Sequence, residues 1–291
     1  MKKTKTKLPK IEVITNVTVV NKPEVNEPTS THPVIDTIHH VFIVDRSASM
    51  NAIKQVTISG LNEQIETIKQ NETKFKCKQT VTLILFNHIV TEVLYNQSVS
   101  KLQKFNDESF DPAGCTSLND AIGYTFSKLL QDFKNSKTTD ILVNIFTDGE
   151  ENNSKDYSQV AARTLIEQGQ TNKWTVAFIG ANQNVMHTAT SYSIPKSNTM
   201  AYTSDHVGTQ LAFRNLSKAR SAYIGDVTCS TKAYSGSGQS INFFSTEDKI
   251  VDLTFPNAKT LMTADISGKD NTDDYDPDAA AAAQKQSASG N

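Results

Sequence analysis

Three hydroxyl groups and two carboxylates stand at positions where a protein can bind a hard metal ion. Asp45, Ser47 and Ser49 alternate along the chain directly after an apolar run. Thr116 lies in a later segment of small residues, and Asp148 follows another apolar run. Carboxylate and hydroxyl oxygens are the ligands that hard divalent cations such as Mg²⁺ prefer. No other set of residues in the sequence points as clearly to a function.

These side chains need a scaffold that brings distant segments of the chain together. From about residue 37 to 224, apolar runs of strand length alternate with segments whose apolar residues recur at helical spacing. This alternation favours an α/β fold with a doubly wound, mostly parallel central sheet and helices on both faces. Ligands bind to such sheets beyond the carboxyl ends of the strands. Because Asp45 and Asp148 each follow a strand, we expect both at this edge of the sheet.

The expected elements follow the apolar patterns. Strands are expected at residues 37–44, 81–86, 141–146, 174–179 and 199–202, with 89–95 as a hairpin partner of the second. Helices are expected at residues 51–70, 118–133, 154–168, 185–191 and 207–223. Ser117 is expected to cap the second helix, and Gly169 is expected to close the third.

Two aspartates at one edge of a sheet repel each other. Two unit charges about 5 Å apart cost about 3 kcal/mol at an effective dielectric constant of about 20, and a divalent cation would offset that cost. We expect Ser47 and Ser49 to bind Mg²⁺ directly, and Thr116 to bind it directly or through water. Asp45 and Asp148 would act largely through bound waters and by orienting the hydroxyls.

This ligand set has a consequence for the partner of the metal. With mostly neutral direct ligands, the cation keeps much of its positive charge and one position open to solvent. An anionic oxygen is the natural ligand there, such as the carboxylate of an Asp or Glu on another protein. The sequence therefore favours a non-catalytic, metal-dependent protein-binding module.

The site residues also resemble those of a known family. Three short motifs, taken in order, resemble the metal-ion-dependent adhesion site of von Willebrand factor A domains: Asp45-x-Ser47-x-Ser49, Gly114-x-Thr116 and Thr147-Asp148-Gly149. The resemblance covers about two thirds of the chain, and intracellular bacterial and phage members look most similar around the first motif. It implies a Rossmann-like fold, Mg²⁺ or Mn²⁺ as the metal, and a protein ligand. It also implies that ligand capture can couple to movement of the last helix, at residues 207–223.

Two other functions remain open at this stage. In one, the chain is a structural component of a large assembly such as a phage virion, and the alternating segment at residues 11–20 adds a strand to a partner's sheet. In the other, it is a Mg²⁺-dependent phosphohydrolase, since a cation with open positions polarises a phosphate. The sequence contains no Gly-x-Ser-x-Gly motif, and no general base is evident for Ser47, so we do not expect an enzyme.

We divide the chain into an N-terminal extension at residues 1–36, a domain at 37–224 and a C-terminal extension at 225–291. Short strands are expected in the C-terminal extension at residues 241–244, 249–255 and 260–262. Disorder is expected from about residue 265, where the sequence becomes acidic and then rich in alanine, serine and glycine.

The composition bears on the compartment. The chain has 291 residues, a formal charge of −2 and three cysteines (Cys77, Cys115 and Cys229) too far apart for a disulfide framework or a zinc site. No apolar run approaches the roughly 20 residues that span a bilayer, and no apolar signal core follows the basic first residues. We expect a cytoplasmic protein, or one in a virion or its host's cytoplasm, with no membrane and no nucleic-acid partner.

Other residues with chemical potential have ordinary interpretations. His39 and His40 are expected to be strand histidines, because no second ligand stands at metal-binding spacing. Cys115 is expected to be a small buried side chain, as free cysteines usually are. Glu150 and Glu151 are expected in a solvated loop beside the metal site.

Overall fold

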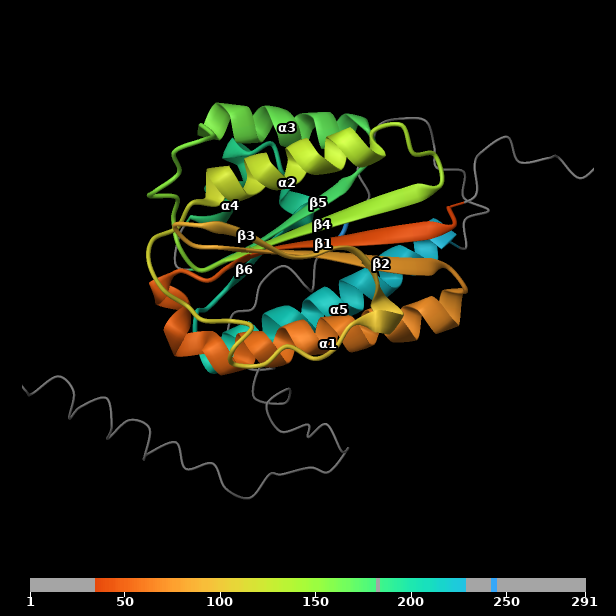
Figure 1. The fold of residues 1–291 in the computed structure, drawn as a ribbon, viewed down its shortest axis with the longest axis horizontal. Helices are drawn as coiled ribbons and strands as arrows, with labels where there is room; N and C mark the ends of the chain where they lie inside the picture. Colours follow the sequence, from red (N-terminus) through yellow and green to blue (C-terminus); the bar gives the residue numbers. More distant parts are fainter. Residues whose placement is uncertain (1–34, 182–183, 229–241, 245–291) are drawn as a thin grey trace, which may run out of the picture. The chain divides into compact units, whose positions relative to one another are not determined.

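The computed structural model describes residues 35–181, 184–228 and 242–244. In this part of the chain six strands form one sheet, in the order β3-β2-β1-β4-β5-β6 (Figure 1). All neighbouring strands are parallel except β2 and β3, which are antiparallel. The doubly wound, mostly parallel α/β fold expected from the sequence is therefore confirmed.

The strands are β1 (Thr37–Asp45), β2 (Lys78–Phe86), β3 (Val90–Ser98), β4 (Thr139–Thr147), β5 (Thr175–Ala181) and β6 (Thr199–Tyr202). The α-helices are α1 (Lys54–Phe75), α2 (Leu118–Phe133), α3 (Gln159–Thr171), α4 (Val185–Ser191) and α5 (His206–Thr228). Three short 3₁₀ segments are η1 (Ala48–Ile53), η2 (Val99–Lys101) and η3 (Lys196–Asn198).

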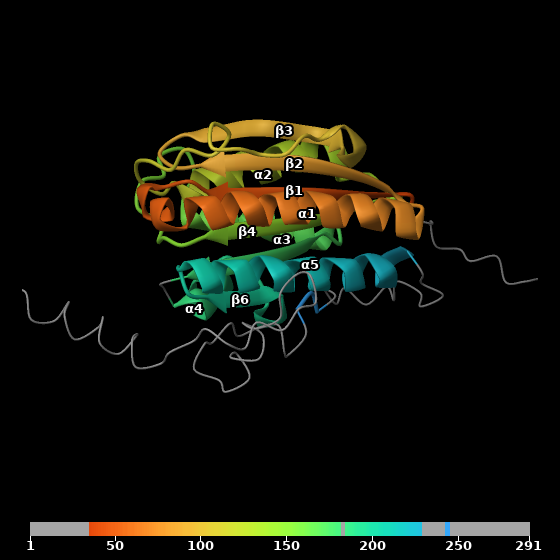
Figure 2. The same ribbon diagram turned by 90° about the horizontal axis from the view of Figure 1, so that it is seen from below.

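The helices cover both faces of the sheet. Helices α1 and α5 run side by side along one face, while α2, α3 and α4 cover the other (Figures 1 and 2). Each face has its own cluster of buried apolar side chains. Strand β1 lies between β2 and β4 in the middle of the sheet. Eight of its nine residues are therefore buried, and only Thr37 at its start is partly exposed. Continuous burial of this kind explains the unbroken apolar run in its sequence.

Helix α1 begins and ends later than the sequence predicted. Its expected apolar stripe is correct, because Ile58, Leu61, Ile65 and Ile68 are all buried in the core. The expected start at residue 51 lies instead in the 3₁₀ segment η1. The helix runs on to Phe75 because it packs along α5, an interaction that helical periodicity alone does not reveal.

The prediction for α3 was wrong at both ends. The helix begins after Ser158, whose hydroxyl accepts a hydrogen bond from the Ala161 amide at 3.2 Å. It continues past Gly169, which was expected to close it. A Cβ atom at Gly169 would lie only 2.7 Å from Cε3 of Trp174, so this glycine allows close packing and does not terminate the helix.

The start of α2 is capped from another segment. Ser117 occupies the N-cap position as expected, but its hydroxyl makes no capping hydrogen bond. The amide of Asn119 instead donates to Oε2 of Glu151 at 2.8 Å, and the amide of Asp120 donates to Oγ of Ser154 at 3.1 Å. Glu151 is thus a capping residue rather than part of a solvated loop, and its negative charge complements the positive end of the helix.

The last helix extends beyond the expected domain boundary at 224, since α5 ends at Thr228. Phe243 and Phe244 are buried in the core on the α5 face, and the Phe243 ring meets that of Tyr223 at 5.8 Å. The amide of Phe244 donates to the Ser197 carbonyl at 3.1 Å. Residues 242–244 form no strand, contrary to the prediction for 241–244.

Several other predictions fall outside the described residues. They are the strand at 11–20, the strands at 249–255 and 260–262, and the disorder from about residue 265. The division into extensions and domain at residues 36 and 224 stays a prediction. Within the described ranges, every helix is too short or too polar to cross a lipid bilayer.

His39 and His40 are ordinary strand histidines, as expected. Both are fully buried in β1. Nδ1 of His39 lies 2.6 Å from Oγ1 of Thr80, and Nε2 lies 3.0 Å from Oγ1 of Thr82. Burial lowers the pKa of His39 to about 4, because the charged ring would lose its hydration.

Candidate functional site

The carboxyl ends of β1 and β4 bring the two halves of the predicted site together. The strands are parallel neighbours, with Val44 paired to Phe146. The next residues, Asp45 and Thr147, therefore lie side by side, and Thr147 Oγ1 donates a hydrogen bond to Asp45 Oδ2 at 2.7 Å. Asp148 follows at once and reaches the same edge.

Asp45 carries a buried carboxylate. Its Oδ1 accepts the amide of Ser47 at 2.7 Å, and its side chain is fully shielded from solvent. Burial raises the pKa of Asp45 to about 6, against the opposing effect of hydrogen bonds from Thr147 and Ser47, and the nearby charge of Asp148 adds to the rise. No Lys or Arg forms an ion pair with it among the described residues. A cation at this edge would supply the missing countercharge.

The two serines are arranged around Asp148. Oγ of Ser47 lies 3.0 Å from Oγ of Ser49, and Oγ of Ser49 donates to Oδ1 of Asp148 at 2.6 Å. A serine hydroxyl has one proton and two lone pairs. Because Ser49 donates to Asp148, the hydrogen bond between the two serines is donated by Ser47, and one lone pair of Ser49 remains available to a metal ion.

Thr116 is held by a loop that is tied to the first motif. The amide of Ala48 donates to the Gly114 carbonyl at 3.0 Å, and the amide of Ala113 donates to the Arg46 carbonyl at 2.9 Å. Gly114 adopts a positive φ of 74°, which a residue with a side chain rarely accepts. The loop therefore returns tightly onto the end of β1, and the buried Thr116 side chain is brought to the same edge.

Gly149 marks the point on which these oxygens converge. A Cβ atom built on it would lie 3.1 Å from Oγ1 of Thr116, 3.7 Å from Oδ2 of Asp45 and 3.8 Å from Oγ of Ser49. Three oxygens from two separate segments, the motif at residues 45–49 and the loop of Thr116, thus border one small space, which the absence of a side chain at Gly149 leaves open. Mg²⁺ binds oxygen at about 2.1 Å, so small side-chain shifts or bridging waters would suit the space to such an ion.

One further residue at this edge was missed by the sequence analysis. Ser204 Oγ donates to Oδ2 of Asp148 at 3.0 Å, from the turn between β6 and α5. Ser204 lies two residues past a strand end, as Ser47 does after Asp45, and this position was the one signal that could have found it. Tyr202, the last residue of β6, is buried nearby, and its pKa is raised by burial and by the charges of Asp148 and Asp45.

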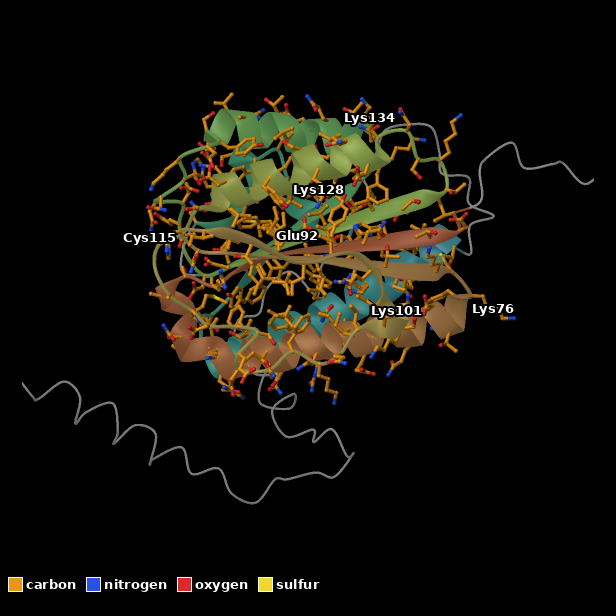
Figure 3. All side chains as sticks on the ribbon, viewed as in Figure 1. Lys76, Glu92, Lys101, Cys115, Lys128 and Lys134 are labelled. Carbon is orange, nitrogen blue, oxygen red and sulfur yellow. The ribbon has the colours of Figure 1, made fainter. Side chains whose placement is uncertain are left out.

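Other residues expected near the site lie apart from its oxygens. Cys115 is exposed rather than buried, because the loop turns its side chain outward where β1 and β4 finish (Figure 3). Glu150 is also exposed, which fits its expected place in a solvated loop. Among the residues described, no three His, Cys, Asp or Glu side chains gather as a metal cluster, so the candidate site depends on two carboxylates and on hydroxyls.

Comparison with known proteins identifies a match over most of the sheet and its helices. The family model of the von Willebrand factor type A domain matches residues 41–216 of this chain. No curated protein sequence matches the chain.

Several solved structures are similar in fold. Manganese-loaded TRAP protein of Plasmodium vivax is 20% identical, with 57% of this chain and 68% of that one covered and a TM-score of 0.41. Proximal thread matrix protein 1 from the mussel byssus, with a zinc-occupied MIDAS motif, is 13% identical, with coverage of 65% and 47% and a TM-score of 0.46. The pilus adhesin SpaC from Lactobacillus rhamnosus GG is 10% identical, with coverage of 67% and 31% and a TM-score of 0.51. The chain thus spans less than half the length of the mussel protein and of the adhesin.

Proposed function

Since this chain belongs to the von Willebrand factor type A family, we propose that it is a non-catalytic protein-binding module with a metal-ion-dependent adhesion site. The site is formed by the five side chains expected from the sequence: Asp45, Ser47, Ser49, Thr116 and Asp148. When bound, Mg²⁺ or Mn²⁺ supplies a positively charged position with coordination open to an anionic oxygen.

The observation that carries this proposal is the convergence of oxygens around Gly149. Thr116 is far from Asp45 and Ser49 in the sequence, yet all three residues place an oxygen within 3.8 Å of the same point at Gly149. Two of these oxygens belong to hydroxyl groups and one belongs to a buried carboxylate. This donor set suits a hard divalent cation and does not suit a soft one, which prefers thiolate or imidazole ligands.

The two carboxylates organise the hydroxyls. Asp45 accepts the Ser47 amide on one oxygen and the Thr147 hydroxyl on the other, so its position is fixed by the strands. Asp148 accepts a hydrogen bond from Ser49, and Ser47 donates to Ser49, which leaves one lone pair of Ser49 for the cation. Both aspartates therefore act mainly by orienting neutral ligands and by supplying negative charge from behind them.

The charge distribution supports a carboxylate-bearing partner. With hydroxyls as its direct ligands and the aspartates acting largely through water, a divalent cation keeps much of its charge and favours an anionic oxygen as a further ligand. We propose that this ligand is an Asp or Glu side chain of a partner protein. In this proposal the chain provides most of the ligands of the cation, and the partner carboxylate provides a further one.

The proposal is tested by combining metal titration with partner capture. Isothermal titration of the wild-type protein with MgCl₂ and MnCl₂ should show one site, and Ser49→Ala should lose it. Ser100→Ala is a matched control, because Ser100 is an exposed serine that also contacts another serine, Ser98, at 2.9 Å.

Capture of proteins from a native lysate should then occur in Mg²⁺ and fail in EDTA or with Ser49→Ala. Equal capture under all these conditions would refute a metal-dependent interaction. If neither MgCl₂ nor MnCl₂ gave a binding isotherm with the wild-type protein, the metal site itself would be refuted.

A further inference from the structure

The turn between β6 and α5 contributes a residue to the site that no sequence motif marks. From its geometry we infer that Ser204 is a positioning residue: it holds Asp148 in the orientation that directs the Ser49 hydroxyl toward the cation. This inference rests on the proposed function. It adds a sixth side chain, one that acts on the metal through Asp148 and not as a ligand.

The first step concerns the two oxygens of Asp148. Oδ1 accepts from Ser49 at 2.6 Å, and Oδ2 accepts from Ser204 at 3.0 Å. A carboxylate with a single partner can turn about its terminal torsion, which has a broad energy profile. Partners on both oxygens fix the plane of the group, so the contact with Ser204 also decides which oxygen faces Ser49.

The second step concerns the proton of Ser49. Ser47 and Ser49 lie 3.0 Å apart, so the Ser49 hydroxyl has two acceptors within reach, Ser47 and Asp148. If it donated to Ser47, a lone pair of Ser49 would face the Asp148 carboxylate at 2.6 Å, and the repulsion would displace the Ser49 oxygen from its place beside the cation. A fixed Asp148 removes this alternative, because a charged acceptor binds the proton more strongly than a neutral hydroxyl does.

The third step is that Ser204 is itself held in place. The Asp205 amide donates to the Thr203 carbonyl at 2.8 Å, and the Gly208 amide donates to Oδ1 of Asp205 at 2.7 Å. A Cβ atom on Gly208 would lie 2.1 Å from Oγ1 of Thr203 and 2.3 Å from its carbonyl oxygen. The turn is thus folded against the first turn of α5 too closely for any side chain at Gly208.

The fourth step explains how β6 reaches a residue of β4. These strands are not neighbours, because β5 lies between them. The rings of Phe146 and Tyr202 stack at 4.9 Å between centroids, each two residues before the partner that makes the hydrogen bond. The last residue of β5, which pairs with Tyr202, is the small Ala181. Ser204 and Asp148 can therefore meet beyond the end of the intervening strand.

The test compares metal affinity with stability in matched variants of the full chain. Ser204→Ala should weaken Mg²⁺ binding by about 10- to 100-fold, the usual effect of removing a residue that orients a metal ligand. The melting temperature of this variant in EDTA should match that of the wild type. Ser204→Thr keeps the hydroxyl and should restore most of the affinity.

Ser158→Ala separates positioning from general stability. It removes a serine hydroxyl that caps α3 and leaves the turn of Ser204 intact, so it should lower the melting temperature in EDTA by a few degrees with little change in Mg²⁺ affinity. The opposite pattern in Ser204→Ala and Ser158→Ala distinguishes a role at the metal from a role in the fold.

Each remaining outcome is decisive. Unchanged Mg²⁺ affinity in Ser204→Ala overturns the inference while the proposed function stands. A loss as complete as that of Ser49→Ala, without rescue by threonine, also overturns it, since Ser204 would then behave as a ligand. If the Ser204→Ala protein does not fold, the melting temperature and the Mg²⁺ affinity of Ser204→Thr test the inference instead. A Ser204→Thr protein with wild-type stability but a 10-fold or greater loss of Mg²⁺ affinity would contradict positioning by the hydroxyl. Absence of Mg²⁺ binding by the wild type would refute both the proposed function and this inference.

Discussion

Arg220 of α5 and His40 of β1 meet inside the core, with Nη1 of the guanidinium 2.6 Å from Nδ1 of the imidazole. Both side chains are fully buried. Burial, followed by the charge of Arg220, holds the pKa of His40 well below its usual value, so the ring is neutral and its Nδ1 accepts the hydrogen bond. Its Nε2 then donates to Oε1 of Gln79 at 2.5 Å. Arg220 also donates from Nε to Gln64 at 3.1 Å, which joins α5 to α1 and to the sheet.

This contact makes a prediction for Arg220. Replacement by methionine removes a charge but leaves His40 and Gln64 with buried acceptors that lack a donor. We expect Arg220→Met to lower the free energy of unfolding by about 2 kcal/mol, the usual cost of orphaned buried polar groups. Urea titration measures this. Lys218→Met is the control, since Lys218 is exposed on the same helix and its loss should change stability by less than about 0.5 kcal/mol.

Asp140 predicts a pH-dependent difference in stability. Burial raises its pKa from 3.8 to about 6, against the hydrogen bond from Tyr223 at 2.6 Å. The folded state therefore binds this proton more tightly than the unfolded state, and the contribution of Asp140 to stability falls as pH rises from about 4 to 6. Asp140→Asn keeps an oxygen acceptor without the charge. It should be more stable than wild type by about 3 kcal/mol at pH 7.5, with the difference vanishing near pH 4.

The wild type must be compared with Asp140→Asn because His39 changes the stability of both proteins with pH in the opposite direction to Asp140. The folded-state pKa of His39 is lowered to about 4, so its contribution to stability is lost as pH falls from about 6.5 toward 4. The wild-type profile alone mixes both effects. Chemical denaturation of wild type and Asp140→Asn at a series of pH values separates them, and a difference that does not depend on pH would contradict the assignment.

Gly149 predicts a variant that folds but does not bind metal. Its φ lies outside the left-handed region, so alanine is compatible with the backbone. The added methyl group would occupy the space bordered by Thr116, Asp45 and Ser49. We expect Gly149→Ala to reduce Mg²⁺ affinity by at least 100-fold, as measured by titration calorimetry, with the circular dichroism spectrum unchanged. Retention of wild-type affinity would show that the cation binds elsewhere.

Metal binding should stabilise the folded state. A ligand that binds only the folded protein adds about 2.7 kcal/mol at a concentration 100 times its Kd. The melting temperature should therefore rise with MgCl₂ and return to its starting value when EDTA is added. In Ser49→Ala the same additions should have no effect. A rise in that variant equal to the wild-type rise would indicate nonspecific ion binding.

Phe244 predicts that the chain beyond α5 contributes to the stability of the domain. Its side chain is 1% exposed and lies in the same core as Tyr223 and Phe213. Phe244→Ala should lower the free energy of unfolding by about 3 to 5 kcal/mol, the typical cost of removing a buried phenylalanine ring. Ile89→Ala is the control, because Ile89 is 56% exposed. Equal denaturation midpoints for the two variants would show that the Phe244 contact is not maintained in solution.

Much of the fold could be predicted because its signals are local. The apolar run of β1 and the helical spacing of Ile58, Leu61, Ile65 and Ile68 each identify an element without knowledge of its neighbours. The predictions were wrong where the role of a residue depends on a neighbour that is distant in the sequence or in another element. The sequence pattern predicts that Gly169 ends a helix, but in the structure a glycine is needed there because the Trp174 ring packs too closely for a side chain. The sequence pattern predicts that Glu151 lies in a solvated loop, but its carboxylate accepts a hydrogen bond from the amide of Asn119 at the start of α2.

The candidate site divides in the same way. The sequence by itself determined that Asp45 and Asp148 reach one edge, because parallel strands end on the same side and each aspartate ends or follows a strand. Only the tertiary structure decided that Ser204 reaches Asp148 across β5, that Cys115 faces outward and that Arg220 is buried against His40. Those contacts depend on the order of strands in the sheet and on how α5 packs against it. They arise from long-range packing, which the pattern of residues within one segment does not encode.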